Sequence, residues 1–229
     1  YLLYIIMYSN LFWKKYQKNV NSSQGEDGII EELLKRLNIN NNGWVCEFGA
    51  WDGIVSSNTF DLIENKNFKG VYIEGEKERF NDLLKTCDKF RNIIPINEFI
   101  SHVEEKNSLG TILSRTDIPI DFDVLSIDID SYDYHVWRSL KKYRPKIVVI
   151  EINSSIKTNN TEHIHEEING IVKYQGTGFR PTFNLGIEKG YKFVLHTGNM
   201  IFVREDLFPK LNVSYNHELE NFRTKWGAF

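Results

Sequence analysis

The stretch WVCEFGAWDG, residues 44–53, predicts a β-strand that runs into a glycine-bearing turn. Its first half is apolar and β-prone, and a helical pattern begins at about Ser57. Gly49 and Gly53 frame the turn, where the backbone can approach a ligand closely because glycine has no Cβ. A turn that merely connects strand and helix is the alternative interpretation. The spacing E-x-G-x-x-x-G differs from the G-x-G-x-x-G of nicotinamide-cofactor sites.

Outward from this turn, apolar β-rich runs alternate with helical patterns, which indicates βαβ units and a parallel sheet. Ahead of the first strand, Ser23 and Glu26 form a capping-box pair for a helix. The runs at 191–196 and 199–205 are separated by Thr-Gly and predict a terminal hairpin with antiparallel character. The other strands are predicted over residues 44–49, 70–76, 92–96, 122–128 and 146–153.

The composition narrows the class of protein. A chain of 229 residues that is 41% hydrophobic fits one α/β domain. Its formal net charge of −3 gives no overall basic field, so nucleic acid is not an expected partner. The two cysteines have no C-x-x-C spacing, which argues against a disulfide scaffold and a thiolate zinc site. We therefore expect a cytoplasmic protein.

The two ends of the chain and one internal segment stand apart from the predicted core. The apolar opening of residues 1–22 is too short for a transmembrane segment, and we expect it to pack on the core. A membrane-surface contact or a homodimer contact is the alternative. Residues 23–208 form the predicted main domain, within which the polar segment 154–184 is a predicted substrate-binding insertion. Residues 209–229 form a tail.

An acidic residue ends the second predicted strand. Ligands of open α/β sheets bind outside the carboxyl ends of the strands, so Glu74 is placed to accept hydrogen bonds from two ribose hydroxyls. The alternative is an exposed carboxylate in a loop that also holds Glu76 and Glu78.

With these residues in view, the chain resembles the class I S-adenosylmethionine-dependent methyltransferases, specifically their FkbM-like branch. The resemblance rests on the order and spacing of SQGEDGII, EFGAWDG, GVYIEGEKERF, LSIDIDSYDYHVW, PKIVVIEIN and LGIEKGYKFVLHTGNMIFVRED. It implies a Rossmann-like α/β fold with a mostly parallel seven-stranded sheet and an antiparallel C-terminal hairpin strand.

The resemblance also implies S-adenosyl-L-methionine as cofactor. The glycine turn would hold its methionine part, the acid after the second strand its ribose, and residues after the third strand its adenine. Ser57 and Asn58 would assist at the carboxylate, while Gln24 and Asp27 would close over the cofactor. The implied cofactor-binding residues are Gln24, Asp27, Glu47, Gly49, Ala50, Gly53, Ser57, Asn58, Glu74, Glu98, Phe99 and Asp128.

Three aspartates, Asp128, Asp130 and Asp133, follow the fourth strand. On an extended strand Asp128 and Asp130 point to one face, where like charges raise each other's pKa unless a cation compensates. The fifth strand ends with Glu151 and Asn153, again two apart. These oxygen ligands suit magnesium, manganese or calcium better than zinc. Helix N-capping by Ser131 or Asp133 is the alternative, and it would account for only one of the three aspartates.

This pattern is similar to metal-dependent O-methyltransferases such as the catechol and macrocin enzymes. The similarity implies Asp128, Glu151 and Asn153 as ligands of Mg²⁺ or Mn²⁺, and Asp130 as general base. The Glu-x-Asn pair departs from the neighbouring residues of those enzymes, so a metal-free site remains open.

The long polar loop supplies other candidates. His163 and His165 are candidate catalytic bases near neutral pH, with a solvated pair as the alternative. Tyr174, Phe179 and Arg180 either line an acceptor pocket or form a satellite cluster under the loop.

The sequence as a whole predicts an O-methyltransferase acting on a hydroxyl of a sugar, nucleotide-linked sugar or glycan. The expected partner is therefore a small-molecule or glycan acceptor. An NAD-type dinucleotide-dependent oxidoreductase, a metal-dependent hydrolase and a non-catalytic cofactor- or glycan-binding domain are the alternatives.

Overall fold

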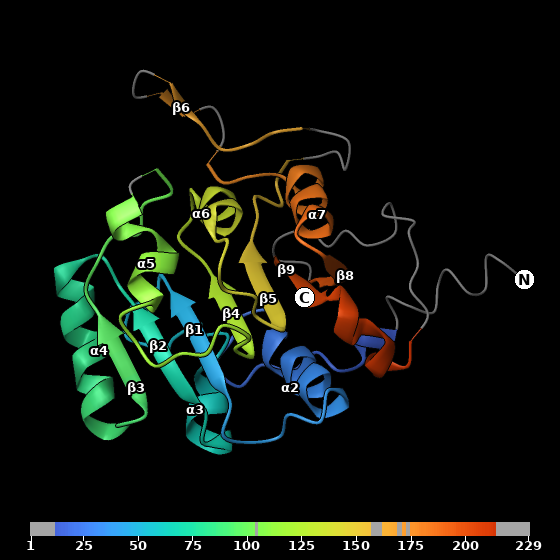
Figure 1. Ribbon diagram of the computed structural model, residues 1–229, viewed down its shortest axis with the longest axis horizontal. Coiled ribbons are helices and arrows are strands. Elements are labelled where there is room, and N and C mark those ends of the chain that lie inside the picture. Colours follow the sequence, from blue (N-terminus) through green and yellow to red (C-terminus); the bar gives the residue numbers. More distant parts are fainter. Residues whose placement is uncertain (1–11, 104, 157–161, 169–170, 173–174, 214–229) are drawn as a thin grey trace, which may run out of the picture.

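The computed structural model describes residues 12–103, 105–156, 162–168, 171–172 and 175–213. Its centre is a seven-stranded sheet with the strand order β3-β2-β1-β4-β5-β9-β8 (Figure 1). Neighbouring strands from β3 to β5 run parallel, whereas β9 is antiparallel to both β5 and β8. This is the predicted mostly parallel sheet with an antiparallel hairpin strand. The strands are β1 (Trp44–Phe48), β2 (Lys69–Ile73), β3 (Ile93–Ile96), β4 (Val124–Ile127), β5 (Ile147–Glu151), β8 (Tyr191–His196) and β9 (Asn199–Arg204).

Helices cover both faces of this sheet. One apolar cluster joins the sheet to α2, α3 and α4, and a second joins it to α5, α6 and α7. Successive strand residues alternate between the clusters: Val45 packs in the first and Cys46 in the second. Burial on both faces explains why the strands are nearly continuous apolar runs. The helices are α2 (Glu26–Arg36), α3 (Phe60–Lys66), α4 (Lys77–Lys89), α5 (Leu109–Leu113), α6 (Asp133–Ser139) and α7 (Phe179–Glu188), with 3₁₀ turns η1 (Glu105–Asn107) and η2 (Glu205–Leu211).

The predicted capping box before α2 is wrong. The N-cap residue is Gly25, which has φ of 93° and no side-chain cap. Ser23 instead donates its hydroxyl to Ser56, 2.8 Å away. The Glu26 carboxylate is buried and accepts a hydrogen bond of 2.6 Å from Thr197 of the distant β8–β9 hairpin. The other oxygen of Glu26 accepts the backbone amide of Gln24 at 2.9 Å, so this carboxylate combines a local and a tertiary contact in place of the Ser23 pairing.

The predicted fourth strand is too long at its carboxyl end. β4 stops at Ile127, and Asp130 has φ of 60°, in the left-handed region. Asp128 and Asp130 are therefore not two positions of one extended strand, and the alternation argument for them is wrong. A sharp turn brings their side chains together instead.

The polar insertion rises beyond the carboxyl ends of β4 and β5 and carries a short two-stranded sheet of β6 (Glu167–Ile168) and β7 (Ile171–Val172) (Figure 1). Phe179 starts α7 and is a buried member of the second apolar cluster, so the expectation that it lines an acceptor pocket is wrong. Tyr174 lies outside the described residues.

The described part of the N-terminal segment packs on the core. Trp13 is buried in the first apolar cluster, while residues 1–11 lie outside the described residues. Within the described ranges, no helix has both the length and the apolar character needed to cross a membrane.

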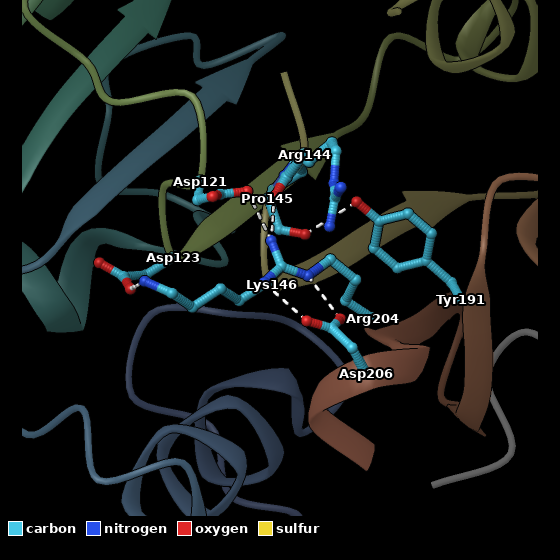
Figure 2. Close-up of polar contacts among 8 residues, drawn as sticks. All are labelled: Asp121, Asp123, Arg144, Pro145, Lys146, Tyr191, Arg204 and Asp206. Atoms are coloured by element: carbon cyan, nitrogen blue, oxygen red, sulfur yellow. Dashed lines mark hydrogen bonds and ion pairs between the residues drawn. The ribbon is translucent and has the colours of Figure 1, made fainter. Parts of the chain in front are cut away.

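Polar contacts tie together the amino ends of β4 and β5, opposite the edge where these strands end (Figure 2). Arg204 of β9 binds Asp121 at 2.6 Å and Asp206 at 2.7 Å. The Tyr191 hydroxyl donates to the carbonyl oxygen of Pro145 at 2.8 Å. These contacts fasten the hairpin to the loops that lead into the parallel strands.

Candidate functional site

A cavity of about 510 Å³ opens at the carboxyl ends of β1, β2 and β4. This is the edge of an open α/β sheet where ligands bind. Of the residues expected to contact a cofactor, the cavity is lined by Glu47, Gly49, Ala50, Glu74, Glu98, Phe99 and Asp128.

The two glycines of the turn after β1 have positive φ, and each packs closely against a neighbouring segment, Gly49 against backbone and Gly53 against side chains. Gly49 has φ of 74°, and a Cβ there would lie 1.7 Å from the carbonyl oxygen of Asp128. Gly53 has φ of 78°, and its Cβ would lie 2.8 Å from the Leu83 side chain. Gly53 does not line the cavity. The turn is thus held against β4 on one side and α4 on the other.

Glu74 presents a buried carboxylate to the cavity. One oxygen accepts a hydrogen bond of 2.9 Å from the Trp51 amide, and the other accepts one of 2.8 Å from the Glu76 amide. A carboxylate has about four acceptor sites, so two remain for hydroxyl groups of a ligand.

Apolar and ionic groups form the outer wall. Phe99 is 70% exposed and its ring lies against Gly75, where a Cβ would be 2.4 Å from a ring atom. Trp51 is also exposed at the cavity. Glu98 forms a two-point ion pair with Arg115, at 2.6 and 2.8 Å, which lowers the pKa of Glu98. The rings, rather than the Glu98 carboxylate, are therefore available to a flat ligand.

Most hydrogen bonds of the Glu47 carboxylate are made with groups inside the protein. It accepts from the Ser57 hydroxyl at 2.7 Å, from the Asn58 amide at 3.1 Å and from the Thr59 hydroxyl. Burial raises the pKa of Glu47. Asn58 also donates from its side chain to Ser126 at 3.1 Å. Ser57 and Asn58 lie outside the cavity lining, where they fasten the turn to β1 and β4.

Gln24 and Asp27 also lie outside the cavity lining. One oxygen of Asp27 accepts the backbone amides of residues 20–22 at 2.7 to 2.9 Å, so this carboxylate shapes the N-terminal loop. The Gln24 side chain lies so close to Gly198 that a Cβ there would be 2.1 Å from the Gln24 amide nitrogen.

Three carboxylates meet where β4 and β5 end. Oxygens of Asp128, Asp130 and Glu151 lie within 4.8 Å of one another. Burial, followed by the charges of neighbouring carboxylates, raises the pKa of Asp128 to about 7. The same two causes raise the pKa of Glu151, and the two side chains are hydrogen-bonded to each other. Both shifts favour the protonated form, and a hydrogen bond between two carboxyl groups requires that one of them carries a proton.

A second cavity, of about 420 Å³, lies beside this cluster. Asp130 lines both cavities. No hydrogen bond to its side chain comes from any other residue in the described ranges. The remaining lining residues of the second cavity are Glu151, Ile152, Asn153, Ser155, Gln175 and Gly176.

Asn153 lies at the neck of the insertion, by which we mean residues 153–155 and 175–177, where the insertion begins and ends. Its side-chain nitrogen Nδ2 donates to the Gln175 carbonyl at 2.6 Å, and its side-chain oxygen Oδ1 accepts from the backbone amide of Ser155 at 2.9 Å. Its backbone amide donates to the Thr177 carbonyl at 2.9 Å. The expected metal ligand oxygen of Asn153 is thus directed to Ser155.

The two insertion histidines lie outside the lining of both cavities. His165 is buried, and its Nδ1 accepts the Gly176 amide at 3.1 Å. Its carbonyl oxygen accepts a hydrogen bond of 2.8 Å from Nε2 of His135 in α6. His163 accepts the Gly178 amide at its carbonyl oxygen. These contacts shape the insertion.

Sequence reasoning missed part of the cavity wall. His102 and Tyr132 stack with ring centroids 4.8 Å apart, and both line the larger cavity together with Trp51 and Arg79. Tyr132 lies among the three aspartates, between Asp130 and Asp133, which was an available signal. His102 comes from the loop after β3, and nothing in the sequence around it indicated a place in the cavity wall. Only the fold brings it to the cavity.

Neither a protein-family model nor a curated protein matches the sequence significantly. Among solved structures, the fibrillarin pre-rRNA processing protein of Methanococcus jannaschii is similar with a TM-score of 0.53 and 15% identity, over 82% of this chain and 76% of that one. The N-terminal domain of EvdMO1, determined in the presence of SAH and D-fucose, has a TM-score of 0.49 and 10% identity, over 80% and 83% of the two chains. A SAM-dependent methyltransferase from Aquifex aeolicus has a TM-score of 0.42 and 12% identity, over 87% and 94%.

The sheet order and the likeness to fibrillarin show the fold. The chain has the Rossmann-like class I methyltransferase fold that its sequence predicts.

Proposed function

We propose that this chain is an S-adenosylmethionine-dependent O-methyltransferase, of the FkbM-like branch, that acts on a hydroxyl of a sugar, nucleotide-linked sugar or glycan. One observation carries the proposal: the carboxylate of Asp130 lies between two adjacent cavities and lines both. In methyl transfer the acceptor oxygen attacks the methyl carbon directly, so the general base must lie beside the point where acceptor and donor meet and reach the hydroxyl proton from there.

The larger cavity would take the cofactor. The free acceptor sites of Glu74 match two ribose hydroxyls, and the exposed ring of Phe99 matches a flat base. The turn at Gly49 and Ala50 would border the methionine part.

The smaller cavity would take the acceptor. Its described lining includes two carboxylates and polar groups, and it has no basic side chain. Such a lining favours a neutral molecule rich in hydroxyl groups and opposes a carboxylate or phosphate. This supports a neutral sugar unit as the methylated part of the acceptor.

The mechanism follows from the position of Asp130. Bound S-adenosylmethionine would supply an electrophilic methyl group on a sulfonium. Asp130 would take the proton of the acceptor hydroxyl onto its carboxylate as that oxygen forms the new bond to carbon. Glu74 would hold the donor in place, so that binding energy is used to align the reacting atoms.

A divalent cation fits the acidic cluster. Asp128 and Glu151 already approach closely enough to share a proton, and their oxygens are the ligands that Mg²⁺ or Mn²⁺ prefers. A cation there would lower the pKa of an acceptor hydroxyl. Asn153 supports such a site less well, because its oxygen accepts from Ser155.

The test is incubation with labelled S-adenosylmethionine and a library of sugars, nucleotide sugars and glycans, with and without a chelator. Asp130→Asn should lower turnover by about 100-fold or more, because general-base catalysis contributes at least that much. Its affinity for S-adenosylhomocysteine, measured by calorimetry, should stay within about twofold. Asp82→Asn, at an exposed helical ion pair, is the control and should keep full turnover.

Each alternative has a distinct outcome. Greater thermal stabilisation by NAD than by S-adenosylhomocysteine would favour the oxidoreductase. Metal-dependent cleavage of a phosphoester without methyl donor would favour the hydrolase. Cofactor binding without transfer to any acceptor would favour the non-catalytic domain. The cytoplasmic location and the homodimer contact of the N-terminal segment remain predictions.

A further inference from the structure

The turn that carries Asp130 has an unusual backbone. Asp130 has φ of 60°, in the left-handed region, which costs free energy for residues other than glycine although aspartate adopts it more readily than most. It follows β4 by three residues and precedes α6 by three. Contacts that stabilise this turn therefore also help to determine where the Asp130 side chain lies.

The support is the carboxylate of Asp133. One of its oxygens accepts the amide of Ile129 at 2.8 Å, and the other accepts the amide of Ser131 at 2.9 Å. The Ser131 hydroxyl closes the same turn by donating to the Ile129 carbonyl at 3.1 Å. Both oxygens of one buried side chain thus bind the amides on either side of Asp130.

Helix capping does not explain this arrangement. A capping side chain accepts amides that follow it in the first helical turn. Asp133 is itself the first residue of α6 and reaches back to residues 129 and 131, and the N-cap residue Tyr132 makes no side-chain cap. The predicted capping role of Asp133 is therefore wrong.

The geometry points to Asp133 as a positioning residue, whose carboxylate holds the two amides that flank Asp130 and so keeps the Asp130 side chain between the two cavities. The inference rests on the proposed function, because Asp130 is the proposed base. Catalysis is sensitive to displacements of about 1 Å, so a relaxed turn would lose rate even with Asp130 intact.

The main variant is Asp133→Asn, which keeps the size of the side chain but replaces one acceptor oxygen by a donor. We expect kcat to fall at least tenfold, while the affinity for S-adenosylhomocysteine changes less than twofold. Asp133→Ser, with a single oxygen, is the second variant if the first does not fold. Ser108→Ala is the matched control, because Ser108 caps α5 by accepting the Thr111 amide at 3.2 Å, away from both cavities.

Two further measurements separate positioning from general destabilisation. In an Asp130→Gly background the left-handed turn persists without a carboxylate, so adding Asp133→Asn should lower the residual rate by less than twofold. Amide hydrogen exchange should become at least tenfold faster in Asp133→Asn at residue 129 or residue 131, whichever amide loses its acceptor oxygen, and at neither residue in Ser108→Ala.

The inference is overturned if Asp133→Asn loses no more kcat than Ser108→Ala, or if the two amides remain protected in it. Hydrogen exchange requires no turnover. If the wild-type protein transfers no methyl group but the exchange rates change as expected, the proposed function fails and the support of the turn by Asp133 stands.

Discussion

Single residues set the shape of the cavity floor. The backbone of Gly49 lies against the carbonyl oxygen of Asp128, so the turn after β1 and the end of β4 touch without an intervening side chain. Because the carboxyl end of β4 leads directly into the acidic cluster, a displacement at Gly49 would be transmitted to Asp128.

Gly49→Ala should reduce the free energy of unfolding by about 2 kcal/mol or more, since it adds left-handed strain to a steric overlap. It should also weaken binding of S-adenosylhomocysteine. Gly110→Ala is the control: Gly110 is helical and its Cβ would lie 3.9 Å from Leu140, an ordinary contact. It should be neutral or stabilising by about 0.5–1 kcal/mol in a denaturant titration. Equal stability of the two variants would contradict the steric argument.

Lys189 provides a pH dependence far from the cavity. Its ammonium donates to the Leu140 carbonyl at 2.7 Å. Burial, followed by the charge of Lys141, lowers the pKa of Lys189 from 10.5 to about 8. Between these two values the unfolded chain binds the proton and the folded chain does not, so stability rises with pH in that window.

We therefore expect the wild-type free energy of unfolding to rise relative to Lys189→Met by about 1 kcal/mol between about pH 8 and 10.5, allowing for partial exposure. Urea titrations at several pH values measure this difference. Lys85→Met, at an exposed helical position, should show no such slope. A constant difference across the window would mean that Lys189 is not perturbed.

At the scale of elements, the insertion is joined to β5 through a narrow neck. At this neck the segment that leaves β5 lies beside the segment that leads into α7. Asn153 joins the two segments through its backbone amide and its side-chain nitrogen, and its side-chain oxygen binds Ser155. The same neck forms part of the smaller cavity, which connects the insertion to the proposed acceptor.

Asn153→Ala should raise KM for the acceptor by about tenfold, because the loss of hydrogen bonds worth about 1 kcal/mol each loosens this wall. The affinity for S-adenosylhomocysteine should not change. Steady-state kinetics and calorimetry measure the two effects. Asn65→Ala, which removes an exposed hydrogen bond to Asp61 in α3, is the control. A larger effect on cofactor than on acceptor would contradict the assignment of the two cavities.

Across the whole molecule, the carboxyl ends of the parallel strands and their amino ends have different roles. The carboxyl edge carries both cavities, whereas the amino ends of β4 and β5 are fastened to the C-terminal hairpin by Arg204 and Tyr191 (Figure 2). Stability and proposed activity should therefore be separable by mutation.

Tyr191→Phe should lower the free energy of unfolding by about 1–2 kcal/mol, because it leaves the buried carbonyl of Pro145 without its donor. Turnover at a permissive temperature should remain unchanged. Tyr143→Phe removes a hydroxyl that forms no hydrogen bond with any residue in the described ranges, and it should change stability by less than about 0.5 kcal/mol. A loss of kcat in Tyr191→Phe would show that the two edges are coupled.

Prediction from sequence succeeded where the signal is local. The alternation of apolar runs with helical patterns predicted β1 to β5 and the hairpin β8–β9, because period and length are properties of a short segment. The prediction of a capping box was wrong because Glu26 accepts hydrogen bonds from the Gln24 amide and from Thr197, which is 171 residues away, and none from Ser23. The predicted end of β4 was wrong because the Asp133 carboxylate, three residues after Asp130, binds the amides of the turn that ends the strand.

For the candidate site, the topology of parallel strands was enough to predict which residue types gather at one edge. Glu74 follows β2, Asp128 follows β4 and Glu151 is the last residue of β5, so their placement at one edge requires only that these strands run parallel. The direction of each side chain was not predictable. Ser57 and Asn58 point inward and bind Glu47 and Ser126. The ring of His165 accepts the backbone amide of Gly176 inside the insertion.

By itself, the sequence determined the order of strands and helices and the acidic character of the carboxyl edge, since these depend on local periodicity and on parallel pairing. Only the tertiary structure decided which carboxylate remains available to a substrate. Asp133 is committed to two amides and Asp128 to Glu151, while Asp130 is left between the cavities. The physical reason is that hydrogen bonds between distant segments exist only once packing has brought their donors and acceptors within about 3 Å.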